Sequence, residues 1–305
     1  MSWVSDYQYT WLQKLALNAL QISGHIPHHI AFVMDGNRRF ARSKQLDKIE
    51  GHSRGFAKLA DVLRWCLDMG IREVTTFAFS IENFKRSRDE VEGLFNLARD
   101  KFAKLLAEIE RLDEHGIRIR VLGNIELLPA DLQRLIASAM LRTEHNDKLF
   151  LNVAFAYTSR DEITQAVESV LQAEENPDSE DALLPTDINE RLLEACLYTR
   201  HSPPPDLVFR TSGETRLSDF MMWQIKSSVL YFTQVLWPQI TIWNFMAGII
   251  AYQRDRSRIE DFRSEQRLHS AQLAKSSDFY SLRVQKFLHK LDANRRKLLI
   301  ALASN

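Results

Sequence analysis

The sequence predicts an α/β protein built on a six-stranded, mainly parallel sheet flanked by helices. Short apolar runs alternate along the chain with longer segments whose apolar residues recur at helical spacing. This alternation is typical of parallel sheets that are covered by helices on both faces. With 305 residues, 45% of them hydrophobic, the chain can bury a sizeable core. Such sheets bind ligands outside the carboxyl ends of their strands, so the segments just after each strand are the first candidates for a site.

The six apolar runs are the expected strands. They are HIAFVMD (29–35), EVTTFAFS (73–80), IRIRVLG (117–123), LFLNVAFAY (149–157), DLVFR (206–210) and VLYFT (229–233). Amphipathic helices are expected over 51–69 and 88–115, each ended by the glycine that follows it. Two further helices should begin near residues 129 and 160.

Two segments flank a central domain that we expect over residues 26–252. Residues 1–25 should form an amphipathic helix whose apolar face carries Trp11, Leu12, Leu15, Ala16, Ala19 and Leu20. Such a stripe more often faces a core or a partner than a membrane, although Trp3 and Trp11 leave interfacial membrane contact open. Residues 253–305 form a charged extension, and residues 241–303 are expected to be two long helices. This C-terminal helical hairpin would serve either interaction or packing.

The composition narrows the possible partners. Forty basic residues balance forty acidic ones, so we expect no nucleic-acid partner, and any anion site must be built locally. The two cysteines, Cys66 and Cys196, lie in apolar helical segments and suggest a reducing compartment without disulfides. No apolar run approaches the roughly 20 residues that a membrane-spanning helix needs, and the N-terminus has no signal-peptide pattern.

The first polar cluster directly follows the first strand. It comprises Asp35, Gly36, Asn37, Arg38 and Arg39. The glycine lets backbone N–H groups approach an anion, a helix that begins there adds its positive end, and arginines bind phosphate oxygens. Asp35 would repel phosphate unless a hard cation such as Mg²⁺ bridges them, which makes it a candidate metal ligand. The alternative is an ordinary N-cap on a basic surface helix.

Two further clusters also follow strands. The second comprises Ser80, Glu82, Asn83 and Arg86, and the third comprises Arg210, Thr211, Ser212, Gly213, Arg216 and Ser218. Two arginines that flank a glycine turn can close on one diphosphate, although ordinary caps and polar loops are the alternatives. The chain contains neither G-x-x-x-x-G-K-[ST] nor G-x-G-x-x-G. A diphosphate on an apolar tail therefore fits better than a nucleotide.

Five ordered segments resemble the motifs of the cis-prenyltransferases, which are the undecaprenyl and dehydrodolichyl diphosphate synthases. They are HIAFVMDGNRR, GHSRGF, FAFSIENFKRS, RTSGETRLSDFMMWQ and LYFTQVLWP, and the resemblance spans about residues 28–252. The segments CLYTRHSPPPDLVFRTSGE and MSW most resemble the catalytic subunit of the eukaryotic dehydrodolichyl branch. The resemblance implies repeated condensation of isopentenyl diphosphate onto an allylic primer such as farnesyl diphosphate, with cis double bonds. The product would be a long polyprenyl diphosphate for dolichol and protein glycosylation.

The resemblance also implies roles for single residues. Asp35 would hold Mg²⁺, and Asn83 with Ser80 would assist diphosphate departure and proton removal. The residues expected at the allylic diphosphate are Gly36, Asn37, Arg38, Arg39 and Arg86, with His52 nearby. Those expected at isopentenyl diphosphate are Arg210, Arg216 and Ser218. The apolar faces of the helices at 51–69 and 88–115 would line a tunnel for the growing chain, or would simply face the sheet.

Two departures from the family pattern bear on assembly. Homodimeric members have an acidic residue at the position of Val229, and they end in an Arg-x-Gly motif that none of the ten glycines here matches. In eukaryotic relatives the motif comes from a second, non-catalytic subunit of the same fold. We therefore expect a heteromer with a Nogo-B-receptor-like partner, peripheral to the cytosolic face of the endoplasmic reticulum membrane.

Two other functions are alternatives to this one. The first is the non-catalytic subunit itself, which the retention of Asp35, Arg86 and Arg210 argues against. The second is an unrelated phosphoryl-transfer enzyme, for which the chain lacks a Walker-type lysine.

Overall fold

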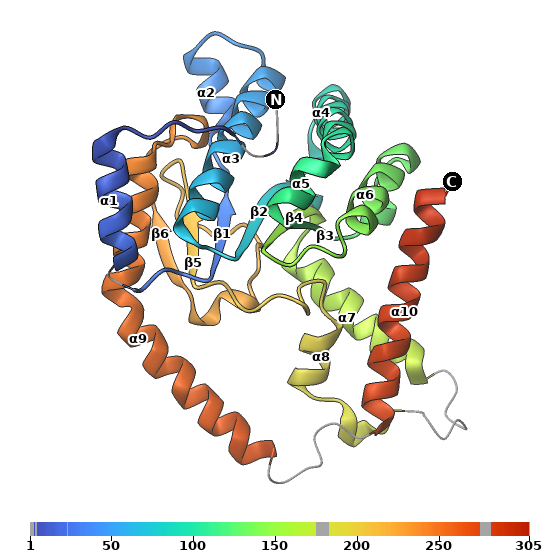
Figure 1. Ribbon diagram of the computed structural model, residues 1–305. Helices are drawn as coiled ribbons and strands as arrows, with labels where there is room; N and C mark the ends of the chain where they lie inside the picture. Colours follow the sequence, from blue (N-terminus) through green and yellow to red (C-terminus); the bar gives the residue numbers. More distant parts are fainter. Residues whose placement is uncertain (1–2, 4, 23, 175–182, 275–281, 305) are drawn as a thin grey trace.

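The fold is a single six-stranded sheet in which all neighbouring strands run parallel (Figure 1). The computed structural model describes residue 3 and residues 5–22, 24–174, 183–274 and 282–304. The strands are β1 His29–Val33, β2 Glu73–Ser80, β3 Ile117–Leu122, β4 Leu149–Tyr157, β5 Leu207–Arg210 and β6 Val229–Phe232. The predicted strands and their parallel arrangement are confirmed.

The strand order positions the site. It runs β3-β4-β2-β1-β5-β6, so β2, β3 and β4 lie on one side of β1 and the later strands β5 and β6 lie on the other. The order therefore reverses between β1 and β5, where the loops that leave the two strands diverge and open a crevice. The register pairs Val33 with Arg210 at this edge. The first and third polar clusters are thus neighbours at the switch point.

Side-chain alternation divides the strands between two faces. Ile30 and Phe32 join a large core that includes buried residues of several helices. These are α3 Lys48–Met69, α4 Arg88–Ala107, α5 Ile109–His115, α6 Ala130–Arg142 and α9 Ile242–Ala274. Ala31 and Val33 face the other way and pack with Phe220 and other residues after β5. A third apolar cluster joins α7 Ser159–Glu174, α8 Glu190–Cys196 and α10 Leu282–Ser304.

One helical prediction needs adjustment. The expected helix over 88–115 is interrupted at Glu108, whose ψ of 25° departs from the helical repeat and separates α4 from α5. Ile109 and Leu112 remain buried, so the apolar stripe continues across the break. The expected domain boundary between 252 and 253 falls inside α9.

The N-terminal helix α1, Trp11–Ile22, turns a different face to the core from the one expected. Leu17 is its buried residue, with Ala16 and Leu20 packed against the core. Trp11 is 76% exposed and Leu15 58% exposed, so this part of the predicted stripe is on the surface. Within the described part of the chain, the helices fall short of the length and apolarity that crossing a bilayer requires.

The two C-terminal helices are present as predicted, but they lie on opposite sides of the molecule (Figure 1). α9 packs along β6 and α1, and α10 packs against α6 and α8. Arg295, which interrupts the apolar stripe of α10, donates from Nη2 to the backbone oxygen of Cys196 at 2.6 Å. It therefore satisfies a carbonyl at the C-terminal end of α8.

Arg263 holds the outer half of α9 to the sheet, and its loss should be destabilising. Its Nη1 donates to Asp206 Oδ1 at 2.6 Å, and Asp206 Oδ2 accepts from the backbone of His28 and His29. Arg263→Ala leaves a mostly buried carboxylate without its cation, so we expect a loss of about 2 kcal/mol in urea unfolding. The exposed Arg254 is the matched control, and Arg254→Ala should change stability by less than about 0.5 kcal/mol. Equal effects in the two variants would contradict this role.

Candidate active site

The first cluster is built where the chain leaves β1. The backbone N–H of Asp35 donates to Thr211 Oγ1 at 3.1 Å, and Thr211 Oγ1 donates to the backbone oxygen of Asp35 at 2.8 Å. Gly36 follows with φ 102°, and a Cβ there would lie 2.9 Å from Leu236 Cδ2. Only glycine fits this turn without strain. The loops after β1 and β5 are therefore fastened to each other at the residue predicted to hold metal.

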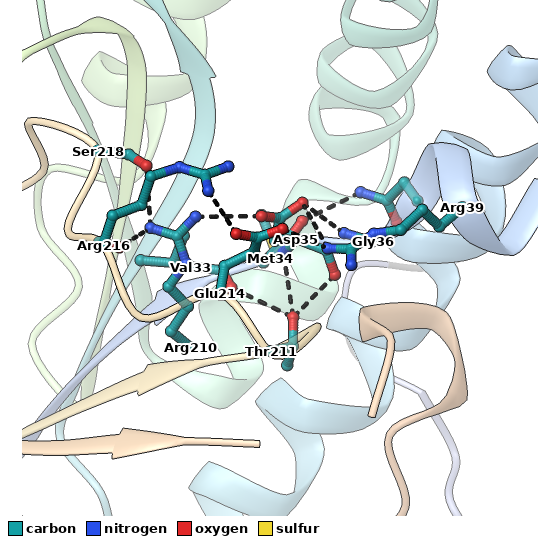
Figure 2. A network of polar contacts seen from close by, with 11 residues as sticks. Val33, Met34, Asp35, Gly36, Arg39, Arg210, Thr211, Glu214, Arg216 and Ser218 are labelled. Atoms are coloured by element: carbon teal, nitrogen blue, oxygen red, sulfur yellow. Dashed lines mark hydrogen bonds and ion pairs between the residues drawn. The ribbon is translucent and has the colours of Figure 1, made fainter. Parts of the chain in front are cut away.

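Three arginines share two carboxylates at this point (Figure 2). Arg210 Nη2 lies 3.1 Å from Asp35 Oδ2, and Arg39 Nη2 lies 4.0 Å from Asp35 Oδ1. Glu214 binds Arg39 at 3.3 Å and also pairs with Arg216. The acidic and basic groups that lie apart in the sequence thus form a single cluster, in which three arginines exceed two carboxylates by one charge.

Arg210 is the most enclosed of these cations. It is 2% exposed, and its Nη1 donates to Ser218 Oγ at 2.9 Å and to the backbone oxygen of Arg216. Burial lowers the pKa of Arg210, and the Asp35 carboxylate opposes that shift. Its buried Nε has no hydrogen-bond partner among the described residues. A buried donor in this state is suited to an anionic ligand.

The second cluster is organised by Glu90, a buried residue of α4 that the sequence analysis did not single out. Its carboxylate lies 3.0 Å from Arg86, 3.1 Å from Lys48 and 3.5 Å from Arg38. Burial alone would raise the pKa of Glu90, but the hydrogen bond from Lys48 and the arginine charges outweigh it and lower the pKa. The i,i+4 spacing of Arg86 and Glu90 is the sequence signal that could have indicated this pair.

Ser80 and Asn83 also belong to the second cluster: Ser80 ends β2 and caps the 3₁₀ helix η1, Ile81–Lys85, which carries Asn83. Ser80 Oγ accepts from the backbone of Glu82, and Asn83 Oδ1 accepts from the backbone of Ser80 at 3.1 Å. This reciprocal cap fixes both side chains at the end of β2. With its Oδ1 engaged, Asn83 presents its amide nitrogen as a hydrogen-bond donor.

All three clusters line one cavity of about 850 Å³. The twelve predicted site residues that line it are Asp35, Gly36, Asn37, Arg38, Arg39, His52, Ser80, Asn83, Arg86, Arg210, Arg216 and Ser218. Two further buried polar atoms, Asn37 Oδ1 and His52 Nε2, have no partner among the described residues. Gly55 makes room for Asn37, since a Cβ at Gly55 would lie 2.2 Å from Asn37 Oδ1. The polar wall is therefore built to receive a ligand with several acceptor and donor atoms.

The rest of the cavity is apolar. Phe56 and Leu59 of α3 and Leu94 and Phe102 of α4 contribute to its lining. Trp3 also lines this part of the cavity, where the centroid of its ring lies 4.8 Å from that of Phe56 and its Nε1 donates to the backbone oxygen of Lys101 at 2.9 Å. The cavity thus combines a charged wall with an apolar chamber, as an amphipathic ligand requires.

The residues present fit a magnesium ion only in company with a ligand. Among the residues that the structure describes, no three acidic, histidine or cysteine side chains are grouped to hold a metal. Val229 is buried at the start of β6, paired in register with Leu207, and supplies no oxygen. Mg²⁺ commonly binds through one or two carboxylates and completes its shell with phosphates and water. Asp35 beside Arg39 and Arg210 matches that pattern.

Comparisons with known proteins identify the family. A family model described as a putative undecaprenyl diphosphate synthase matches residues 33–260. The human dehydrodolichyl diphosphate synthase complex subunit is 51% identical over 86% of this chain and 78% of its own length. The corresponding subunit of Schizosaccharomyces pombe is 42% identical, with 83% and 93% covered. The crystal structure of lavandulyl diphosphate synthase from Lavandula x intermedia, in complex with dimethylallyl diphosphate, superposes with a TM-score of 0.69 at 30% identity and covers 75% and 96% of the two chains.

The buried His52 should make stability depend on pH in a defined window. Burial, reinforced by the charge of Arg86, lowers its pKa from 6.5 to about 4. Between these two pH values the unfolded chain binds a proton that the folded protein does not. Stability from neutral His52 is therefore complete above pH 6.5 and is lost as the pH falls toward 4.

The measurement is urea unfolding of the protein and of His52→Gln at pH 7 and pH 4.5. The variant should lose less stability than the parent between the two values. Other buried histidines, such as His29, titrate in both proteins and cancel in the comparison. Identical losses would show that His52 is not held in its neutral form.

Proposed function

The chain belongs to the cis-prenyltransferase family and is an enzyme of the dehydrodolichyl diphosphate synthase type, and from this premise we propose its substrates, site residues and assembly. The substrates are isopentenyl diphosphate and an allylic primer of the farnesyl diphosphate class. The product is a long-chain polyprenyl diphosphate. The observation that carries the proposal is one cavity in which the twelve predicted site residues, from loops, strand ends and helices, meet an apolar chamber.

The allylic diphosphate binds the wall made by the loop after β1 and by Arg86. Arg38 and Arg86 each have the partly buried Glu90 as counter-ion, which keeps two cations side by side at low cost. Gly36 and Asn37 bring backbone N–H groups to the same point. Asp35 holds Mg²⁺, which when bound supplies charge that stabilises the departing diphosphate. The hydrocarbon tail of the primer extends into the chamber between α3 and α4.

Isopentenyl diphosphate binds Arg210, Arg216 and Ser218. Asp35 and Glu214 pair with these arginines, and a diphosphate carries more charge than either carboxylate. Arg210 and Arg216 therefore exchange a carboxylate partner for the diphosphate. That exchange releases the carboxylate of Asp35, so binding of the substrates and exposure of the metal ligand are one event.

The reaction joins the two substrates across the gap between these clusters. The allylic carbon–oxygen bond breaks, and the diphosphate leaves with the electron pair. The terminal methylene carbon of isopentenyl diphosphate bonds to the allylic carbon, and one proton is lost to form the new cis double bond. Asn83 and Ser80, fixed by their reciprocal cap beside Arg86, assist the departure and the proton loss.

We also infer that the active enzyme is a heteromer. The chain lacks both an acid at Val229 and an Arg-x-Gly motif, so a second subunit of the same fold, similar to the Nogo-B receptor, completes the isopentenyl diphosphate site. The human and mouse relatives are themselves described as complex subunits. The partner would place the enzyme at the cytosolic face of the endoplasmic reticulum membrane.

Removing the proposed metal ligand should abolish turnover without preventing assembly. Asp35→Ala should lower incorporation of labelled isopentenyl diphosphate into farnesyl diphosphate by about a hundredfold or more, because the departing charge loses its cation. The assay is run with Mg²⁺, with and without the partner subunit, and chelation should stop it. Asp131→Asn removes an exposed acid outside the cavity and should have no effect. An Asp35→Ala variant as active as the parent would refute the assignment.

The indole of Trp3 should limit the length of the product. A cavity of about 850 Å³ suits a ligand of ordinary small-molecule size, so a long polyprenyl chain must displace part of the lining. We expect that part to be Trp3, which lines the apolar chamber. Trp3→Ala should therefore shift the products to longer chains, measured by chromatography after removal of the diphosphate. Trp11→Ala alters an exposed residue and serves as the control. An unchanged distribution in Trp3→Ala would show that the chain leaves by another route.

A further inference from the structure

The turn that presents Ser218 has an unfavourable backbone conformation. Ser218 and Asp219 have φ values of 55° and 58°, in the left-handed region that non-glycine residues seldom adopt. Asp tolerates this region better than Ser, and two such residues in succession persist only when their surroundings hold them. Contacts outside the turn must therefore stabilise it.

These contacts come from the first residues of α7. The backbone N–H of Ser159 donates to the backbone oxygen of Asp219 at 2.8 Å, and Ser159 Oγ accepts from the backbone of Met222 at 2.7 Å. Arg160 donates to the Asp219 carboxylate twice, from its backbone N–H at 3.3 Å and from Nε at 2.8 Å. Both the backbone and the side chain of the turn are thus fastened to one end of a helix.

The position of this turn decides the geometry of the third cluster. Ser218 Oγ accepts from Arg210 at 2.9 Å, and Arg210 also donates to the backbone of Arg216. A shift of the turn would therefore move both groups relative to the buried guanidinium. Asp219 and Arg160 line the same cavity as Ser218.

Arg160 also reaches the second cluster. Its Nη2 lies 3.8 Å from Glu82 Oε1, and Glu82 belongs to η1, the segment that carries Asn83 and precedes Arg86. One side chain thus bridges the loop after β5 and the segment after β2. Because the two proposed substrates bind to these two segments, the bridge also bears on their separation.

An ordinary surface ion pair is the competing explanation for Arg160. Its side chain is 78% exposed, and exposed ion pairs contribute little to stability. The two explanations therefore make different predictions. A surface pair can be removed with no consequence, whereas a residue that positions the turn affects substrate affinity while leaving the fold intact.

We propose that Arg160 and Asp219 are positioning residues that hold the Ser218 turn against α7 and set its separation from η1, and that they thereby determine the affinity for isopentenyl diphosphate. This role rests on the proposed function, in which Arg210, Arg216 and Ser218 bind that substrate. Neither residue is required to touch the reacting atoms.

The kinetic test uses Arg160→Gln, Arg160→Lys and Asp219→Ala in the active assembly of the full chain with its partner subunit. Arg160→Gln and Asp219→Ala should raise KM for isopentenyl diphosphate about tenfold or more, the change expected when a charge-assisted hydrogen bond is lost. KM for farnesyl diphosphate should stay within about twofold. Arg160→Lys keeps the charge and should restore part of the affinity. The matched control is Arg296→Gln, which removes an exposed arginine of α10 that pairs with Glu144. This variant should change neither KM.

A second measurement follows the turn without any substrate. Hydrogen exchange over residues 217–222 should accelerate in Arg160→Gln and Asp219→Ala but not in Arg296→Gln, while the unfolding temperature of Arg160→Gln stays within about 2 °C of the parent. Unchanged exchange would overturn the positioning role whatever the substrates are. Equal rises in both KM values, or a KM unchanged for isopentenyl diphosphate in an active enzyme, would also overturn it. If the variants show the predicted acceleration of exchange but the unmutated protein binds neither diphosphate, the proposed function is refuted instead.

Discussion

The ion pair between Asp35 and Arg210 is the contact on which the rest of the site depends. Arg210 is almost completely enclosed, and a buried cation without a counter-ion would be costly. Parallel pairing of β1 and β5 sets Val33 beside Arg210 and so brings Asp35 within 3.1 Å of the guanidinium. The hydroxyl of Thr211 fastens the same two loops through the backbone of Asp35. The position of every other group in the first and third clusters follows from this junction.

A protein of zero net charge can still concentrate cations where it needs them. Glu90 pairs with Arg38, Arg86 and Lys48 on one side of the cavity, and Asp35 and Glu214 pair with Arg39, Arg210 and Arg216 on the other, so each group has more cations than carboxylates. Pairing of this kind orients the arginines before a ligand arrives, and the excess of cations over carboxylates leaves positive charge for an anionic ligand.

The helices that flank the cavity serve both the core and the chamber. In α3, Leu63 and Cys66 are buried in the main core, and Leu59 belongs to that core and also lines the cavity, together with Phe56. Both groups belong to one apolar stripe, and a stripe has the same periodicity whether it faces a sheet or a hydrocarbon chain. Which residues of the stripe line the cavity depends on where Trp3 and α4 leave space between the helices and the strand ends.

The six strands and the parallel sheet could be predicted from hydrophobic periodicity, and most of the twelve predicted residues that line the cavity from the residues after each strand, because both are local signals. His52 was expected only from the family resemblance. Only the tertiary structure decided which groups meet. Glu90, Arg160 and Asp219 interact with site residues through folding, and Arg295 satisfies a carbonyl nearly a hundred residues away. It also decided that Trp11 and Leu15 of the N-terminal stripe lie on the surface while Leu17 is buried. Periodicity shows that a helix has an apolar face, but the packing of distant segments determines what covers that face and which charges are paired.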